Sequence, residues 1–584
     1  MDQGKRSQLI LGISAGAHDT AAALYEDYDI KAAVSLERLT RRKNDRADFP
    51  ELCIDEVLAI AGATRADVDV IAIGRRYFPN EFFRLNTVAG RLQQWFRTNI
   101  RKKNSRNMMR EVRVRKTSAV DLLDAPAFVA HHGFRPDTAM FFYNHHEAHA
   151  LPTLFYTDWP EALLVTADGG GDNVNYSFRT FSNGQLQTLY GGSECDHTPL
   201  PVDSIGEFYS AVTEALGFVP ARHEGKITGL AAFGTPVLYD EMAKHYRVDP
   251  GSGRIQSDFT DHRAVLPYVR KILQGVSRED AAASVQRLTE KLMIESLRHW
   301  VARYPTKHIG LAGGVFANVS VNRLIAEQLG LEEIFVFPAM GDEGLAAGGP
   351  IVYLHERDGL AHWLGQRRRL KDVYLGRDFG DAIDGELTAR PEVARIDGSA
   401  VEGAAQRLAA GQLGAIYTNR MEFGPRALGA RTILANPARR ETHDLLNTRL
   451  NRTEFMPFAP VIQAGKAEQV FGVSRVNAYA CKFMTTTCDV RPEWRSRIPA
   501  VVHLDGSARP QIIERHTNPL YFDILTAFEA ATGLPVLVNT SFNVHEEPIV
   551  NSPKECVRAL LDGRIDFVVT ERGFYERRNQ AGMV

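Results

Sequence analysis

LLVTADGGGD, residues Leu163–Asp172, joins an apolar run to a glycine-rich turn. The first five residues are apolar or β-branched, which predicts a buried strand ending at Asp168. Glycine lets a backbone approach a ligand closely and adopt positive φ. Ligands of open α/β sheets bind beyond the carboxyl ends of strands. The stretch therefore predicts an α/β fold and makes Asp168 a candidate ligand-binding residue.

Strand and helix patterns alternate on both sides of this stretch. Upstream, the apolar spacing predicts an amphipathic helix at Pro50–Ala63 and strands at Leu9–Ile13, Thr20–Tyr25, Ile30–Leu36 and Val68–Ile73. The alternation continues to about residue 355, which favours an α/β architecture throughout the first part of the chain.

A second alternation follows a polar, weakly patterned connector at Gly359–Gly398. It includes predicted strands at Gly414–Tyr417 and Pro535–Val538 and a predicted helix at Leu520–Thr532. A chain of 584 residues exceeds what one hydrophobic core supports. We therefore expect two domains, residues 1–375 and 376–584, and find no internal repeat of short period.

Composition excludes several classes of protein. The chain has 69 Lys and Arg against 71 Asp and Glu, a formal net charge of -2, so no overall charge attracts nucleic acid or acidic lipid. No apolar run approaches the length of a membrane span, and the N-terminus lacks a signal-peptide pattern. The five cysteines are scattered, without the spacing of a zinc site or a disulfide framework. We expect a soluble cytoplasmic protein with no nucleic-acid or membrane partner.

The sharpest local motif is HHEAHA at His145–Ala150, after strand-like Met140–Tyr143. His145 and His149 are four residues apart, so on a helix both imidazoles lie on one face. That spacing suits two ligands of one metal ion, although a hydrogen-bonded histidine cluster is the alternative. Asp342, in a second glycine-rich turn after an apolar run, is a further ligand candidate. Two imidazoles and two carboxylates favour a divalent metal such as iron or zinc.

Two glycine-rich segments fit phosphate binding. Gly310–Asn318 follows a predicted strand and leads into a helix, so its amides, including those of Gly313, Gly314 and Asn318, would face an anion. His223–Leu230 places Lys226, beside Glu224, between glycines. Each signal is weak alone, because glycine-rich turns are common.

Polar loops after strands recur in the second half. Glu422–Arg431 carries Arg426 and Arg431, Arg509 lies in a short loop, and Asn539–Asn543 supplies Asn539, Ser541 and Asn543. Arginine matches phosphate and carboxylate oxygens bidentately. Structural salt bridges are the alternative for any one arginine, but three such loops together predict an anion site.

In order along the chain, nine motifs resemble those of the NodU/CmcH-type O-carbamoyltransferases, which include enzymes of nodulation-factor, cephamycin and tobramycin biosynthesis. They are GISAGAHDTAAAL (12–24), HHEAHA (145–150), DGGGD (168–172), EGKITGLAAFG (224–234), GGVFAN (313–318), GDEGLAAG (341–348), EFGPRALGAR (422–431), FMPFAP (455–460) and VNTSFN (538–543). The resemblance spans nearly the whole chain.

The resemblance implies an N-terminal metal-binding domain of the ASKHA (actin-like ATPase) type and a C-terminal YrdC-like α/β domain. The C-terminal domain would form carbamoyl adenylate from carbamoyl phosphate and Mg-ATP, releasing pyrophosphate. The N-terminal domain would transfer the carbamoyl group to a hydroxyl of a small-molecule natural product or sugar, releasing AMP.

By motif, the resemblance assigns residues to each step. His145, His149, Asp168 and Asp342 would hold the metal, expected to be Fe(II), with zinc or manganese as alternatives. His18 would lie near the acceptor hydroxyl, and an imidazole of ordinary pKa can accept its proton. Glu224, Lys226, Gly313, Gly314 and Asn318 would bind nucleotide. Carbamoyl phosphate and ATP would contact Arg426, Arg431, Arg452, Arg509, Asn539, Ser541 and Asn543, with Arg509 also catalytic.

Two departures from the family pattern bear on the anion site. The usual lysine before Pro-Phe-Ala-Pro falls on Asn451 or Arg452, of which Arg452 is the expected substitute, and a cation is missing at Met456. The usual Gly-Glu-Pro-Ile is Glu546–Ile549, which places an extra carboxylate, Glu546, near the anion site without an evident reason.

Alternatives to carbamoyl transfer are a tRNA threonylcarbamoyl-transfer-like enzyme, a hydrogenase-maturation carbamoyltransferase or a non-catalytic ATP-binding assembly protein. The hydrogenase-maturation enzymes carry zinc-finger cysteine clusters, which this sequence lacks. The segment Arg91–Lys116 is rich in Lys and Arg, including Arg101, and predicts a solvated helical insertion or a contact for an acidic acceptor or carrier. The sequence leaves open the acceptor and the oligomeric state, a homodimer included.

Overall fold

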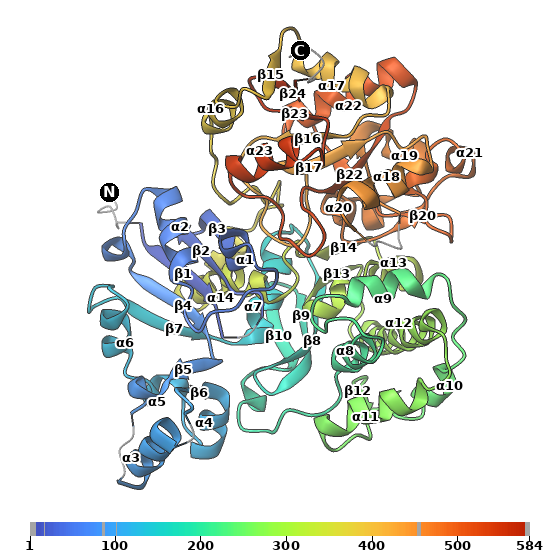
Figure 1. Cartoon of the computed structure of the whole chain (residues 1–584). Coiled ribbons are helices and arrows are strands. Elements are labelled where there is room, and N and C mark those ends of the chain that lie inside the picture. Colours follow the sequence, from blue (N-terminus) through green and yellow to red (C-terminus); the bar gives the residue numbers. More distant parts are fainter. Residues whose placement is uncertain (1–6, 17, 85–87, 101, 453–456, 579–584) are drawn as a thin grey trace.

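The computed structural model describes residues 7–16, 18–84, 88–100, 102–452 and 457–578. Arg101 and Met456 lie outside the described residues. The N-terminal part contains two five-stranded sheets, and the C-terminal part contains one larger sheet (Figure 1). The fold is mixed α/β, as predicted.

The two N-terminal sheets share one plan. The first has the order β3-β2-β1-β4-β7 (Asp29–Ser35, Ala21–Glu26, Leu9–Ser14, Val70–Gly74, Ala139–Tyr143). The second has the order β10-β9-β8-β13-β14 (Gln185–Tyr190, Val174–Ser182, Ala162–Gly171, His308–Ala312, Glu333–Val336). In each, three strands form antiparallel hairpins and the other two run parallel to the first. This duplication supports the ASKHA-type domain that the resemblance implies.

Helices α7 (His145–Phe155) and α14 (Leu345–Asp358) pack between the two sheets (Figure 1). Alternate strand residues divide accordingly, because Ile10 and Leu164 face this central core whereas Leu11 and Leu163 face outward. Glycine permits the close contact of the two helices: a methyl group on Gly348 would lie 1.8 Å from the carbonyl oxygen of Ala148.

Further helices cover the outer faces. The first sheet is covered by α2 (Glu51–Ala61), with α1 (Leu36–Thr40) beside it. The core of the second sheet includes residues of α8 (Ile205–Ala215), α12 (Arg278–Arg303) and α13 (Val319–Gln328). Around these lie α9 (Glu224–Ala231), α10 (Tyr239–Met242), α11 (His262–Ile272) and the hairpin β11–β12 (Tyr246–Val248, Ile255–Ser257).

An insertion between β4 and β7 projects from the first sheet (Figure 1). It contains β5 (Tyr77–Pro79), α3 (Val88–Trp95), a π-helical turn (Phe96–Ile100), β6 (Ser105–Asn107), α4 (Met108–Arg115), α5 (Ala119–Leu122) and α6 (Ala125–His131). The predicted helical character of the basic segment is therefore confirmed by α3 and α4. Leu92, Trp95 and Ile100 are each more than half exposed there.

The C-terminal sheet has eight strands in the order β15-β24-β23-β16-β17-β22-β18-β21 (Val393–Ile396, Phe574–Arg577, Phe567–Val569, Gly414–Tyr417, Arg431–Ala435, Val536–Ser541, Ala459–Gln463, Gln511–Ile513). Helices α17 (Ala400–Ala409) and α22 (Pro519–Thr532) pack together, and α23 (Pro553–Leu561) contacts α16 (Ala382–Thr388). Shorter elements complete it: α18 (Glu441–Arg449), α19 (Ala467–Val470), α20 (Arg475–Lys482), α21 (Pro492–Arg495) and the pair β19–β20 (Cys488–Asp489, Ser507–Ala508).

Two local predictions need correction. The strand expected to end at Asp168 continues to Gly171, and its pairing with β9 breaks between Ala167 and Gly171. The turn lies instead at Asp172 and Asn173, whose φ angles are 44° and 67°. The expected connector is also not featureless, because it holds α15 (Leu360–Leu364), α16 and strand β15 of the C-terminal sheet.

No helix in the described part of the chain is long and apolar enough to span a membrane.

Candidate functional site

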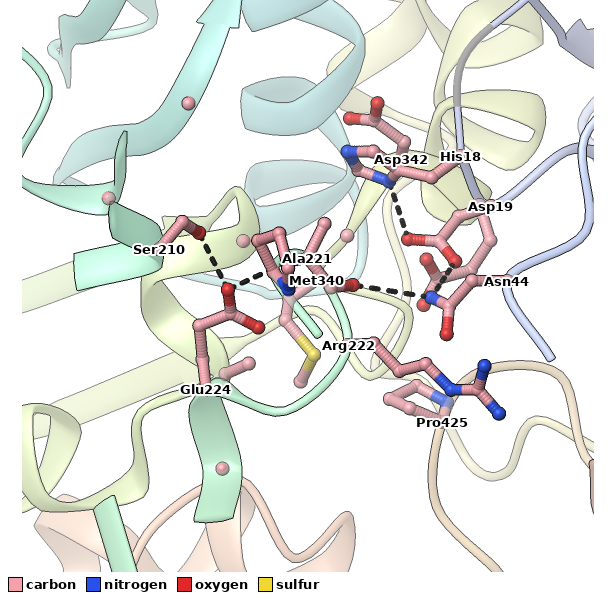
Figure 2. Close-up of a pocket in the computed structure, with 18 of the residues that line it drawn as sticks. His18, Asp19, Asn44, Ser210, Ala221, Arg222, Glu224, Met340, Asp342 and Pro425 are labelled. Atoms are coloured by element: carbon pink, nitrogen blue, oxygen red, sulfur yellow. Dashed lines mark hydrogen bonds and ion pairs between the residues drawn. The ribbon is translucent and has the colours of Figure 1, made fainter. Parts of the chain in front are cut away.

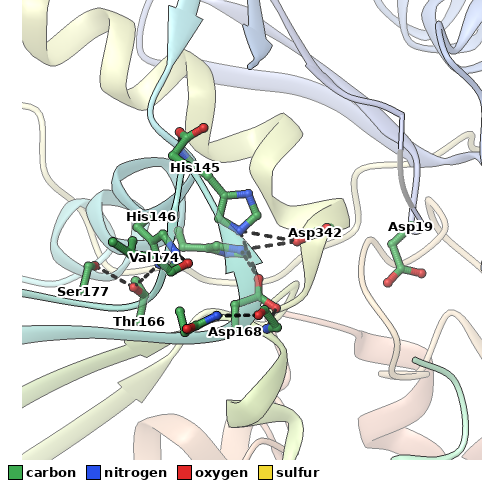
Figure 3. Close-up of polar contacts among 12 residues, drawn as sticks. Asp19, His145, His146, Thr166, Asp168, Val174, Ser177 and Asp342 are labelled. Atoms are coloured by element: carbon green, nitrogen blue, oxygen red, sulfur yellow. Dashed lines mark hydrogen bonds and ion pairs between the residues drawn. The ribbon is translucent and has the colours of Figure 1, made fainter. Parts of the chain in front are cut away.

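Four side chains from three elements meet between the two N-terminal sheets (Figure 3). Helix α7 supplies His145 and His149, β8 supplies Asp168, and a 3-10 turn (Asp342–Gly344) supplies Asp342. Asp168 Oδ2 lies 3.0 Å from His145 Nε2 and 3.3 Å from His149 Nε2. Asp342 Oδ1 lies 3.8 and 3.6 Å from the same nitrogens. The structure thus brings all four predicted ligands together.

The start of α7 aims the two imidazoles. Asn144 caps the helix by accepting a hydrogen bond from the Glu147 amide at 3.0 Å. Asp172 accepts a 2.6 Å hydrogen bond from the His145 amide. With the helix beginning at His145, His149 follows one turn later on the same face.

His146 has a structural role instead. Its Nδ1 lies 2.6 Å from the Thr166 hydroxyl and its Nε2 lies 3.0 Å from the Val174 carbonyl oxygen (Figure 3). Burial lowers the pKa of His146 well below its usual value. The middle histidine of the motif is therefore a neutral group that joins α7 to β8 and β9.

The donor set fits a divalent cation. The four ligand atoms lie within 4.8 Å of one another, and the side chains of His145, His149 and Asp342 are at most 5% exposed. His149 Nε2 and Asp342 Oδ1 are buried without a hydrogen-bond partner, which is costly unless another group binds them. Two imidazole nitrogens and two carboxylate oxygens are ligands that zinc and iron accept.

The carboxylates of the cluster are held ionised. Burial alone would raise the pKa of Asp168, but the adjacent imidazoles of His145 and His149 hold it well below its usual range. Burial likewise opposes the charge of Asp342, yet Arg76 and the histidines keep its pKa low. Burial lowers the pKa of His149, but both carboxylates raise it to about 9. The ionised carboxylates therefore suit a cation, which would replace the proton of His149.

Sequence reasoning missed two arginines beside the cluster. Arg76 Nη2 donates to Asp342 Oδ2 at 2.8 Å, and Arg75 lies 3.0 Å from Asp172 Oδ2 and 2.8 Å from Asp196 Oδ2. Both directly follow β4. The rule that places ligands beyond the carboxyl ends of parallel strands would have found them.

A cavity of about 760 Å³ opens onto the cluster (Figure 2). Among the residues that line it are Asp168 and Asp342 of the candidate metal site, and Arg426, Ser541 and Asn543 from the C-terminal part. Its walls thus come from both halves of the chain.

His18 lines this cavity, as the resemblance implies for a residue near the acceptor. Its Nδ1 lies 2.9 Å from Asp19 Oδ2 (Figure 2). That hydrogen bond, helped by the charges of Asp342 and Asp168, outweighs desolvation and raises the pKa of His18 to about 10. The ordinary pKa assumed from the sequence is therefore not what the structure gives, and at neutral pH His18 is a donor.

Only some of the residues expected to bind nucleotide line the large cavity. Gly314, Asn318 and Glu224 line the large cavity. Glu224 accepts hydrogen bonds from Ser210 Oγ at 2.6 Å and the Ala221 amide at 2.7 Å (Figure 2). Gly313 does not line it; with φ of 97°, it packs where a methyl group would lie 2.3 Å from the Ala167 carbonyl oxygen.

A second cavity, of about 280 Å³, adjoins the first in the C-terminal part. It is lined by the predicted anion-binding residues Arg426, Arg452, Arg509, Asn539, Ser541 and Asn543, together with Lys226. Arg426, Ser541 and Asn543 line both cavities, so the two spaces share a wall.

Arg452 holds the polar loop in place. Its guanidinium donates to Thr540 Oγ1 at 2.7 Å and to the carbonyl oxygens of Ser541 and Asn543 at 2.6 and 2.8 Å. Asn539 donates to Gln511 Oε1 at 2.7 Å, and its own Oδ1 is buried without a hydrogen-bond partner.

Arg431 is not brought to either cavity. Its side chain is fully buried, donates to the Thr418 carbonyl oxygen at 2.6 Å and stacks over Tyr417 at 3.7 Å. Arg431 thus lies within the core of the C-terminal part rather than on a cavity wall. Its contacts stabilise the turn before β17.

Comparisons with known proteins identify the family of the chain. The family model described as "Carbamoyltransferase N-terminus" matches residues 9–351, and the one described as "Carbamoyltransferase C-terminus" matches residues 405–577. The two matches leave residues 352–404 between them, so the domain boundary near residue 375 stays a prediction.

Two nodulation proteins are similar over most of the chain. Nodulation protein NolNO of Sinorhizobium fredii is 31% identical over 586 residues, 96% of this chain and 79% of that protein. Nodulation protein NolO of Bradyrhizobium diazoefficiens is 33% identical over 438 residues, 73% of this chain and 77% of that protein. Among solved structures, HypF of T. kodakarensis is 12% identical to this chain with a TM-score of 0.31; the match covers 61% of this chain and 49% of HypF.

With both parts of the chain matched and a relative aligned over nearly its full length, this protein belongs to the carbamoyltransferase family and is a transferase enzyme.

Proposed function

We propose that this enzyme is an ATP-dependent O-carbamoyltransferase that works in two steps, one at each cavity. The first step, at the arginine-lined small cavity, makes carbamoyl adenylate. The second, at the large cavity beside the metal cluster, transfers the carbamoyl group to a hydroxyl of a small molecule or sugar. The observation that carries the proposal is the wall shared by the two cavities through Arg426, Ser541 and Asn543.

Atom balance fixes what the first step releases. Carbamoyl adenylate contains one phosphate, the α-phosphate of ATP, so the phosphate of carbamoyl phosphate must leave as well. Water cleaves carbamoyl phosphate to carbamate and phosphate. A carbamate oxygen then bonds to the α-phosphorus of ATP, and pyrophosphate departs. Arg426 and Arg509 would neutralise and align these phosphates, and positioning contributes most of the rate in such displacements.

In the second step the acceptor hydroxyl attacks the carbamoyl carbon, the bond to AMP breaks and the hydroxyl proton passes to solvent. His18, protonated at neutral pH, would donate a hydrogen bond to an oxygen that gains charge. Held by His145, His149, Asp168 and Asp342, a divalent metal (iron is expected, with zinc and manganese as alternatives) would supply a Lewis acid for phosphate oxygens.

Pyrophosphate release tests the assignment without knowledge of the acceptor. Purified enzyme is incubated with carbamoyl phosphate, Mg²⁺ and ATP labelled in its two terminal phosphates. We expect labelled pyrophosphate from wild type and from His145→Ala, and none from Arg509→Ala. Arg515→Ala, which removes an exposed arginine paired with Asp523, is the control and should behave as wild type.

Two results would contradict the proposal. Labelled phosphate in place of labelled pyrophosphate would indicate ordinary ATP hydrolysis. Loss of pyrophosphate release in His145→Ala, with Arg509→Ala unaffected, would place adenylate formation at the metal cluster instead.

A further inference from the structure

Glu546, the carboxylate that the sequence leaves unexplained, reaches across to the N-terminal part of the chain. Its carboxylate lies 2.5 Å from Arg222 Nη2, 2.8 Å from His223 Nε2 and 3.6 Å from Lys226 Nζ. Arg222 also donates to the Glu546 carbonyl oxygen at 2.9 Å. Three nitrogen donors of one short segment, at the start of α9, thus converge on one carboxylate.

The backbone at Glu546 is unusual for a residue with a side chain. Its φ is 64°, in the left-handed region that glycine adopts without strain. Glycine is the residue expected at this position from the family pattern. A glutamate held in a conformation suited to glycine needs a compensating interaction, and the contacts with Arg222, His223 and Lys226 provide one.

The contacts between Glu546 and the segment Arg222–Lys226 lie where the two cavities adjoin. Arg222 lines both cavities, whereas His223, Lys226 and Glu546 line the small one. The carboxylate is about one-third exposed, so an incoming anion can compete for its partners. A guanidinium, an ammonium and an imidazole around one anion form a site suited to phosphate oxygens, which carry more charge than a carboxylate.

We propose that Arg222, His223 and Lys226 form a binding site for phosphate groups, and that Glu546 occupies this site until a phosphate displaces it. Its ligands would be phosphate groups of the nucleotide substrate or intermediate, or released pyrophosphate. The identity of the physiological ligand depends on the proposed function; the existence of the site does not.

Other contacts allow Glu546 to be changed without releasing its loop. Arg41 donates to the carbonyl oxygens of Pro548 and Ile549, each at 2.7 Å, and its Nε lies 3.3 Å from Glu555. Asn543 donates to the Glu547 carbonyl oxygen at 2.6 Å. The loop that carries residue 546 should therefore keep its position in the Glu546→Gln variant.

Inorganic pyrophosphate, titrated calorimetrically into the full chain without ATP, tests the site directly. Glu546→Gln removes the competing charge, so we expect pyrophosphate to bind about tenfold more tightly than to wild type. Glu546→Gly, which also relieves the backbone, should show at least the same gain. Glu529→Gln removes the charge paired with Lys466, and neither residue is among those lining the two cavities. It is the matched control and should leave the dissociation constant unchanged.

A double-mutant cycle separates this site from the other arginines of the small cavity. In an Arg222→Ala, Lys226→Ala background, replacing Glu546 with Gln should no longer tighten binding. Unchanged affinity in both Glu546 variants, with melting temperatures equal to wild type, would overturn the proposal. So would an equal gain in the Arg222→Ala, Lys226→Ala background.

The binding measurement does not require turnover. Absence of pyrophosphate release from wild type would therefore count against the proposed function and leave the phosphate site standing. Tighter pyrophosphate binding in Glu546→Gln with normal pyrophosphate release would support both.

Discussion

At the scale of single residues, the protonation of His18 is the feature that sequence reasoning judged least well. The structure pairs it with Asp19, and that hydrogen bond is the largest cause of a pKa raised to about 10. Because a raised pKa keeps the imidazole charged until the pH approaches that value, His18 should be unreactive toward reagents that need a neutral imidazole near neutral pH.

Diethyl pyrocarbonate, which attacks neutral imidazole, can measure this in metal-free protein. At pH 7.5 a pKa of 10 leaves roughly 0.3% of His18 neutral, whereas a pKa of 6.5 would leave roughly 90%. Asp19→Asn removes the main cause of the shift, so we expect its His18 to be modified at least about tenfold faster, as measured by peptide mass spectrometry. Exposed His516 provides the internal reference. Equal rates in the two proteins would show that Asp19 does not control His18.

The candidate metal site gives a second prediction at this scale. His149→Ala removes one of four clustered ligand atoms and should lower affinity for a divalent metal by at least about tenfold, as measured by metal content after dialysis. Removing the metal from wild type should also lower its melting temperature, because buried donors lose their partner. Glu147→Gln changes a neighbouring residue outside the cluster and should keep full metal content. Wild-type metal content in His149→Ala would exclude this cluster as the site.

At the scale of elements, strand β8 can lie close to the start of helix α7 because β8 has glycine, Gly171, at the point of contact. A methyl group on Gly171 would lie 2.1 Å from Cδ2 of His145. A methyl group on Gly169 would meet nothing closer than Glu207 Cγ at 3.9 Å.

The two glycines therefore form a matched pair. Gly171→Ala should displace His145, lower metal affinity and destabilise the fold by roughly 1–3 kcal/mol, the range for overpacked sites. Gly169→Ala makes the same chemical change in the same run and should retain the metal. Isothermal titration with Zn²⁺ and thermal unfolding measure both effects. If the two variants bind metal equally, the packing of β8 against α7 is not what positions His145.

At the scale of the whole molecule, features set by neighbouring residues could be predicted from the sequence more fully than contacts between distant segments. The spacing of His145 and His149 predicts a shared helix face, and the structure confirms it, because a helix turn is set by neighbours in sequence. The β8 strand was predicted too, but its end was not, because its extension depends on pairing with β9.

Contacts between distant segments could not be predicted from one sequence. Arg431 was expected at the anion site, yet its partners are backbone carbonyls of a turn that only the folded sheet brings near. Glu546 found its partners Arg222 and His223 more than 300 positions away in the chain. Likewise, the sequence shows no short repeat that would reveal the common strand order of the two N-terminal sheets, because repeated topology does not require repeated residues.

The central claim, that the two cavities hold two successive reactions, is tested most directly by trapping the intermediate. His145→Ala and Arg509→Ala are each incubated with carbamoyl phosphate and Mg-ATP, and the protein-bound nucleotide is identified by mass spectrometry. Carbamoyl adenylate should accumulate in His145→Ala, where transfer is blocked, and should be absent from Arg509→Ala. Carbamoyl adenylate in Arg509→Ala, with none in His145→Ala, would contradict the assignment of the two cavities.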